Sequence, residues 1–245
     1  MRAFAARLGP MAAEPGSEAI PAATVVLLRD GVDGVETLVL QRNSKLAFGG
    51  MWVFPGGRVD PADHPPDSAS DPVMGDPVAG GLRAARNAAV REAAEEAGLI
   101  VDIDALSVYA HWSPPKIAPK RFTTWFFAAR APAGDVVVDG GEIHEHAWVR
   151  PADGIARRDA GEIELAPPTW VTLHDLARFA TVDDALATID GRAPELFETH
   201  IASVDEAIVA LWHGDAGYGS GDPGAPGPRH RLVMADSGWT YERSP

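Results

Sequence analysis

The 245-residue chain contains no cysteine. Disulfides, thiolate metal sites and cysteine nucleophiles are therefore excluded, and a cytoplasmic location is our expectation. No apolar run approaches the roughly 18 residues of a membrane-spanning helix, so we expect no membrane partner. Basic residues are also few, with 21 Lys and Arg against 35 Asp and Glu and a formal net charge of −14. Because phosphate backbones are bound by clustered Lys and Arg, we expect no nucleic-acid partner.

Composition and length favour one globular domain. Apolar residues make up 46% of the chain, which is enough for a sizeable core. Residues 1–19 lack an apolar signal core and read as a flexible leader. We expect a single domain over residues 20–245, in which the part from about residue 166 onward is a C-terminal helical extension.

The hydrophobic pattern predicts a mixed order of strands and helices. We expect strands at residues 24–29, 36–42, 51–54, 106–112, 122–129 and 145–149, with two more at 207–212 and 230–234. We expect helices at about 82–97, 151–157, 169–179 and 182–189. Because the first strands form hairpins and helices follow only later, the order predicts an α/β (α+β) protein rather than a doubly wound sheet.

The most informative motif is R-E-A-A-E-E-A-G-L at residues 91–99. At about 100° per residue, Glu92, Glu95 and Glu96 lie on one face of the predicted helix, which Gly98 ends. Like charges so close repel each other unless a cation lies against them, and carboxylate oxygens suit Mg²⁺ or Mn²⁺. The plain alternative is a solvated helix face with an Arg91–Glu95 pair. On average composition, R-E-x-x-E-E-x-G matches by chance at about one start in a million.

A strand and a glycine-rich loop precede this helix. Residues 54–63 read F-P-G-G-R-V-D-P-A-D. Together the two segments resemble the Nudix box, G-x5-E-x7-R-E-U-x-E-E-x-G-U, where U is a bulky apolar residue. Counted from Gly57, the seventh position is Asp63 rather than Glu, and the first U is Ala93. The gap to the helix is about twenty residues longer than in the box, and residues 64–80 read as a polar surface-loop insertion.

The resemblance implies a fold and a reaction. The Nudix fold is a mixed β-sheet sandwiched between helices. Its members hydrolyse diphosphate linkages with divalent metal, so the resemblance makes Glu92, Glu95 and Glu96 metal ligands for Mg²⁺ or Mn²⁺. It makes Arg91 a residue that orients a carboxylate.

Residues outside the charged helix complete the expected site. Gly56 and Gly57 would let the backbone approach the phosphates. Nudix hydrolases often use an acid from outside the box as a ligand or base, and Glu145 is our first candidate. Glu142 and Glu164 compete with it for that role.

The substrate is predicted less closely. The run from Gln41 to Leu46, with residues 54–63, resembles the coenzyme A diphosphatase branch. Arg42, Lys45 and Arg121 are the cations that we expect at an anionic small-molecule nucleotide. The alternatives are hydrolysis of ADP-ribose, NADH or nucleotide sugars, or a non-catalytic ligand sensor with a Nudix-like fold. Isopentenyl diphosphate isomerases share the Nudix fold but need a catalytic cysteine, which this chain lacks. The sequence leaves open whether the chain forms a homodimer.

Overall fold

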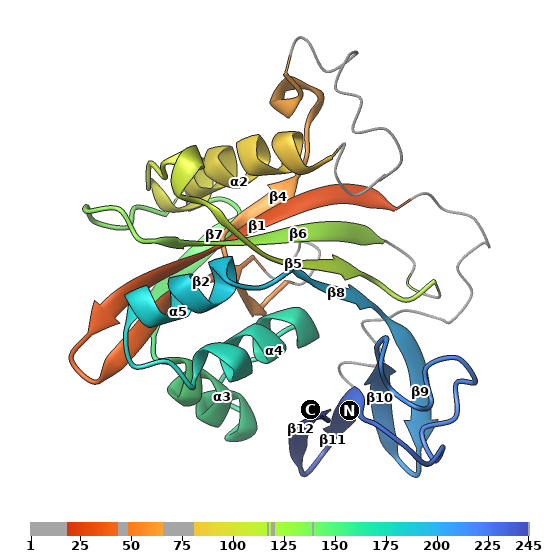
Figure 1. Cartoon of the computed structure of the whole chain (residues 1–245). Coiled ribbons are helices and arrows are strands. Elements are labelled where there is room, and N and C mark those ends of the chain that lie inside the picture. The colour runs from red at the N-terminus through yellow and green to blue at the C-terminus, as the bar shows by residue number, and fades with distance from the viewer. Residues whose placement is uncertain are drawn as a thin grey trace. The chain divides into compact units, whose positions relative to one another are not determined.

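The structure is a computed structural model that describes residues 19–43, 49–65, 81–116, 118, 121–138 and 140–244 (Figure 1). It divides into two compact units. The larger unit comprises Pro21–Ala110 and Thr124–Glu195. The smaller unit comprises the described residues of Met1–Ile20, His111–Thr123 and Leu196–Pro245. The expected leader, Lys45 and nearly all of the 64–80 insertion lie outside the described residues.

A mixed sheet forms the centre of the larger unit. Its strands are β1 (Ile20–Gly31), β2 (Gly34–Arg42), β3 (Trp52–Val53), β4 (Gly56–Arg58), β5 (Ser107–Ser113), β6 (Phe122–Arg130) and β7 (Ile143–Val149). The strand order is β3-β2-β1-β6-β5, with β4 paired to β1 and β7 paired to β2. The hairpin between β1 and β2 closes on a Gly31–Gly34 pair, and Gly34 has a φ of 118° that favours glycine.

Helices cover both faces of this sheet (Figure 1). Helix α2 (Leu82–Ala97) lies on one face, and α3 (Pro151–Asp159), α4 (Pro167–Leu176) and α5 (Val182–Asp190) lie on the other. Short 3₁₀ turns, η1 (Pro61–Asp63) and η3 (Ile103–Ala105), flank α2 in sequence. The expected α+β fold with a sheet between helices is therefore confirmed.

Small side chains allow α2 to pack closely on the sheet. Its buried face consists mainly of alanines: Ala85, Ala88, Ala89, Ala93 and Ala97. They contact a cluster of larger apolar side chains from β1, β2 and β6, and Phe127 at its centre is fully buried. Since alanine brings the helix backbone close to the sheet, residues on the flank of α2 come within reach of the β4 backbone.

One local expectation for the larger unit was wrong. The pair Gly56-Gly57, expected within a glycine-rich loop, begins strand β4, which pairs antiparallel with residues 22–24 of β1. A Gly-Gly pair usually marks a turn, whereas here β1 supplies hydrogen-bond partners for the glycine backbone.

The smaller unit is built on an antiparallel sheet. Strand β8 (Glu195–Glu198) leads into β9 (His200–Val204), β10 (Ala207–Leu211), β11 (His230–Ala235) and β12 (Gly238–Arg243), and the last four have the order β12-β11-β10-β9. Its core is aromatic: Trp112 stacks on Phe197 with ring centroids 3.8 Å apart, and Trp212 meets both rings edge-on. Across the described part of the chain, no helix is long and apolar enough to cross a membrane.

Candidate active site

The β4 glycines lie directly against α2. The N–H of Gly56 donates to Glu96 Oε2 at 2.9 Å. A Cβ on Gly56 would overlap the β1 backbone, and one on Gly57 would overlap the Glu92 carboxylate. The Gly56 position therefore requires glycine because the β1 backbone lies so close, whereas a side chain at Gly57 would have to displace the Glu92 carboxylate. The Gly56 N–H holds the Glu96 side chain against β4.

The carboxylates occupy an unfavourable end of their helix. Gly98 ends α2 with a φ of 68°, and its N–H donates to Ala94 O, as the glycine in the motif predicts. Glu95 and Glu96 thus lie in the last turn, where the partial charge of the helix is negative and no basic residue is present. Placing acids there costs stability, which indicates a role other than support of the helix.

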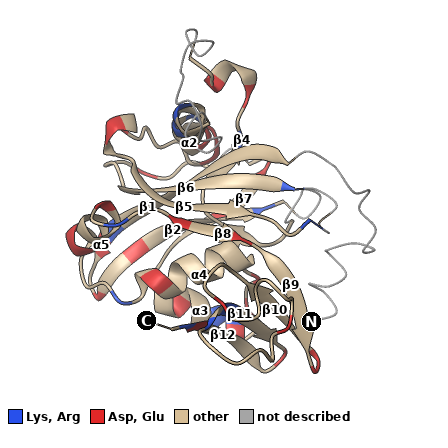
Figure 2. Cartoon of the chain, turned by 45° about the vertical axis from the view of Figure 1, so that its right-hand side comes forward, with Lys and Arg blue, Asp and Glu red and all other residues tan. Residues whose placement is uncertain are grey.

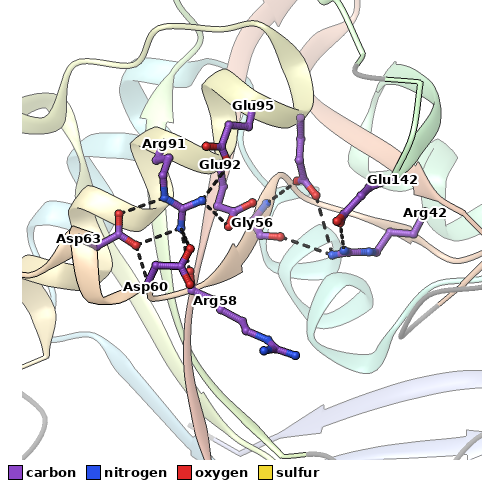
Figure 3. Close-up of polar contacts among 10 residues, drawn as sticks. Arg42, Gly56, Arg58, Asp60, Asp63, Arg91, Glu92, Glu95 and Glu142 are labelled. Carbon is purple, nitrogen blue, oxygen red and sulfur yellow. Dashed lines mark hydrogen bonds and ion pairs between the residues drawn. The ribbon is translucent and has the colours of Figure 1, made fainter.

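Arg91 is the centre of the site (Figure 3). Its Nε and Nη2 donate to Asp63 Oδ1 and Oδ2 at 3.1 and 3.0 Å, a bidentate pair. Its Nη1 donates to Glu92 Oε1 at 2.9 Å and to Glu95 Oε2 at 2.8 Å, and its Nη2 also donates to Arg58 O at 2.9 Å. The expected Arg91–Glu95 pair is present, but it is one contact among several.

The Asp63–Arg91 pair also fixes the place where the insertion leaves the core. Asp63 is 5% exposed, it accepts from the N–H of Asp60 at 2.8 Å, and its carbonyl accepts from Asn87 Nδ2 at 2.7 Å. These bonds tie η1 to α2 across the residues of the insertion. Asp63 is therefore held by Arg91 and by the backbone of its own loop, and the long gap leaves the charged helix face intact.

Burial shifts the acids of this site in different directions. Burial raises the pKa of Glu96 to about 7, although the Gly56 N–H and Arg42 favour the charged form. Burial also raises the pKa of Glu92, against the effect of Arg91. Burial acts likewise on Asp63, but the hydrogen bonds from Arg91 and from the Asp60 N–H, with the charge of Arg91, together outweigh it, and the pKa of Asp63 is lowered. On the Glu92–Glu96 side of the site, Arg91 and Arg42 thus offset the effect of burial only in part.

A second arginine, Arg42, lies beside Gly56 and Glu142 (Figure 3). Arg42 Nη2 donates to Glu142 Oε2 at 2.9 Å, and Arg42 Nη1 lies 3.9 Å from Glu96 Oε1 and 3.5 Å from Gly56 O. The structure therefore brings Arg42, Gly56, Gly57, Arg91 and the three helix glutamates together in the larger unit, with Glu142 beside them.

Of the other predicted residues, Glu145 does not join this group. Glu145 is an exposed residue of β7 opposite Gln41, between the exposed His144 and His146. Arg121 belongs to the smaller unit, where its carbonyl accepts from the N–H of Ile20. Lys45 lies outside the described residues.

The donor set fits a hard divalent cation by its chemistry. Glu92, Glu95 and Glu96 supply carboxylate oxygens on one helix face. The buried acid with the raised pKa is the group that a cation would return to its charged form. In the described ranges, no three His, Asp or Glu side chains already converge in a metal-holding arrangement, because Arg91 and Gly56 engage the glutamates.

Sequence reasoning missed the parts of the site that depend on long-range pairing. Asn87, the carbonyl of Arg58 and the Arg42–Glu142 pair had no local signature. The D-x-x-D spacing of Asp60 and Asp63 was a usable signal, since each caps the other's backbone at η1.

Comparisons with known proteins identify the family and agree with the fold. A family model described as NUDIX domain matches residues 19–167. A solved structure of a NUDIX hydrolase from Alicyclobacillus acidocaldarius is similar, with 24% identity and a TM-score of 0.61 over 70% of this chain and 96% of that one. The NUDIX domain of Shewanella oneidensis NrtR, solved with ADP ribose, is 17% identical, with a TM-score of 0.46 over 71% of this chain and 96% of that one. No curated protein matched.

Proposed function

This chain belongs to the NUDIX domain family and is a hydrolase, and we propose that it cleaves the diphosphate linkage of a nucleoside diphosphate derivative with the help of Mg²⁺ or Mn²⁺. The observation that carries the proposal is the contact between the β4 glycines and the buried carboxylates of α2. It joins a backbone that can approach phosphate to acids that need a cation.

The residues have separate tasks in this proposal. Glu92, Glu95 and Glu96 hold the metal, which when bound neutralises phosphate charge and lowers the pKa of a water. Arg91 fixes the rotamers of Glu92 and Glu95 through its Nη1, while its bidentate bond to Asp63 keeps the guanidinium in place. Gly56 and Gly57 admit the phosphates beside Glu96.

The proton acceptor is one of the acids around this site. Glu92 and Glu96 are buried and have raised pKa values, which brings a carboxylate closer to the basicity that a general base needs near neutral pH. Glu145 remains the proposed acid from outside the helix, with Glu142 as its competitor. Glu142 is the one that contacts Arg42.

Within this reaction class, we propose coenzyme A or an acyl derivative as the substrate. The support is the resemblance of residues 41–46 and 54–63 to the coenzyme A diphosphatase branch. Arg42 lies beside Glu96 and suits an anionic group there, and Lys45 and Arg121 remain candidate contacts. ADP-ribose, NADH and nucleotide sugars are the competing substrates, and a ligand sensor is the non-catalytic alternative.

A product-resolved substrate panel tests the proposal. Coenzyme A, acyl-coenzyme A, ADP-ribose, NADH and a nucleotide sugar are incubated with Mg²⁺, with Mn²⁺ and with chelator. We expect metal-dependent cleavage at the diphosphate, with coenzyme A fastest and with loss of at least a hundredfold in kcat for Glu96→Gln.

Glu36→Gln is the matched control, because Glu36 pairs with Arg29 at 2.6 Å at the β1–β2 hairpin and should retain full activity. Faster turnover of ADP-ribose or NADH would overturn the coenzyme A assignment alone. Binding without any cleavage would favour the sensor.

A further inference from the structure

A bulge in β7 places Glu142 beside the candidate site. The β2–β7 register runs from Thr37↔Val149 to Gln41↔Glu145 and then shifts, so that Arg42 lies opposite Ile143 and His144 is the extra residue. Beyond the bulge, Asn43 N donates to Glu142 O at 2.8 Å and Asn43 Nδ2 donates to Gly141 O at 3.1 Å. Asn43 therefore holds the backbone carbonyls of Gly141 and Glu142, and the Glu142 carboxylate reaches Arg42.

The guanidinium of Arg42 has donors to spare. Only Nη2 makes a short bond, to Glu142, whereas Nη1 makes contacts of 3.5 and 3.9 Å. Its Nε is buried and makes no hydrogen bond to any described residue. The Arg42 side chain is 18% exposed and that of Glu142 is 58% exposed. A planar donor group with unused N–H groups, open on one side, suits a phosphate oxygen.

We propose that Glu142 is an internal competitor for substrate phosphate, occupying on Arg42 the position that an incoming nucleoside diphosphate takes by displacing it. The inference rests on the proposed function, since it assigns Arg42 to the phosphate of that substrate. A carboxylate and a phosphate oxygen use the same guanidinium geometry, so one can replace the other on Arg42. Glu142 thereby sets affinity and selects ligands whose phosphate can displace it.

The surroundings favour displacement over a permanent pair. Glu142 faces Glu96 across Arg42, and the two acids repel each other. Because more than half of the Glu142 side chain is in solvent, its bond to Arg42 is a weak surface-type ion pair. Removing it should tighten ligand binding by roughly two- to fivefold, the range that such a pair supports.

Binding and kinetics of four proteins test the competitor role. Binding of ADP in chelator is measured by calorimetry for the wild type, Glu142→Gln, Arg42→Gln and the double variant, and KM and kcat are measured with metal. Glu142→Gln should lower the Kd for ADP and the KM roughly two- to fivefold. In the Arg42→Gln background the same change should have no effect on Kd.

Glu162→Gln is the matched control, because its side chain is 60% exposed and lies 3.4 Å from Arg157. Unchanged affinity in Glu142→Gln, as in this control, would overturn the inference, and so would failure of ADP to bind any of the proteins. A tenfold loss of kcat at constant KM would instead show that Glu142 acts on the chemistry. Absence of hydrolysis by the wild type would refute the proposed function, while the ADP arm would still decide the competitor role.

Discussion

Each unit of the protein contains one arginine bound bidentately to one aspartate, and the two pairs differ in their surroundings. In the smaller unit, Arg231 donates to both oxygens of Asp215 at 2.7 and 2.6 Å, and the N–H groups of Gly217 and His230 donate to the same carboxylate. The Asp215 side chain is fully buried and that of Arg231 is 6% exposed. Every neighbour named here stabilises the charges of the Arg231–Asp215 pair, which we call the closed pair.

In the larger unit, the corresponding pair is Arg91 with Asp63, which we call the open pair because its arginine is partly exposed. The Arg91 side chain is 26% exposed, and besides Asp63 it donates hydrogen bonds to two further carboxylates, those of Glu92 and Glu95. Acids outnumber arginines around it (Figure 3), while acidic and basic residues are otherwise spread over many elements of both units (Figure 2). The buried Arg231–Asp215 pair holds a loop in place. The Arg91–Asp63 pair has more carboxylates than arginines around it, so a cation can bind there.

The largest expected effect concerns the surplus acids. Glu95→Gln/Glu96→Gln should lower kcat by several orders of magnitude, because it removes two of the three proposed metal ligands. Removing like charges from the last turn of α2 should leave the free energy of unfolding unchanged or slightly raised. Steady-state kinetics and urea denaturation check both parts. Full turnover by the double variant would show that the cluster is only a helix surface.

The next effect is on stability in the closed pair. Asp215→Asn should lower the free energy of unfolding by about 3 kcal/mol, because it leaves the buried Arg231 without a counter-charge. Thermal and urea unfolding measure this loss. We expect kcat per folded molecule of Asp215→Asn to stay within about twofold of the wild-type value. A kcat loss as large as that of Glu95→Gln/Glu96→Gln would show that the two pairs do not differ in function.

A smaller effect on stability is expected at the open pair. Arg91→Lys keeps the charge but loses the bidentate geometry, and should cost about 1–2 kcal/mol in unfolding free energy. Because lysine cannot hold Asp63, Glu92 and Glu95 together, kcat should fall at least tenfold. Arg83→Lys, on the exposed N-terminal part of the same helix, is the control and should change neither quantity. Equal behaviour of the two variants would argue against a positioning role for Arg91.

A pH dependence of stability is expected at the Arg231–Asp215 pair. Burial alone would raise the pKa of Asp215. The hydrogen bonds from Arg231 and from two backbone N–H groups nevertheless lower this pKa to about 2. Since the folded-state pKa lies below the unfolded one, the stabilisation is complete above about pH 4 and is lost as the pH falls through about 2. Its size is about 2 kcal/mol. Unfolding curves of the wild type and Asp215→Asn should converge over that range, and parallel curves would contradict the assignment.

Local patterns predicted the elements whose residues carry their own signal. The helix was expected to end at residue 97 because Gly98 follows it, and α2 ends at Ala97. The hairpin strands β1 and β2 and the helices α3 and α5 were expected close to where they lie. Two strands of the smaller unit, β10 and β11, were also expected, but β9 and β12 were missed because neither contains a fully buried residue that would give a clear apolar pattern.

Features set by pairing between distant segments escaped prediction. Residues 56–58 form a strand only because β1 offers them an open edge. The bulge at His144 decides that Glu142, and not Glu145, reaches Arg42, and no single-sequence pattern shows a register shift of one residue. The charged motif of α2 could be predicted from the sequence. The contacts that arginines make around it depend on where the sheet places other strands.

The most direct measurement of the central claim is Mn²⁺ binding followed by electron paramagnetic resonance, with and without ADP. The samples are the wild type, Glu95→Gln/Glu96→Gln and Asp215→Asn. The account predicts that the wild type and Asp215→Asn bind Mn²⁺ alike and that the double glutamate variant loses this binding. Wild-type Mn²⁺ affinity in the glutamate variant would contradict the assignment of the α2 carboxylates as the metal site.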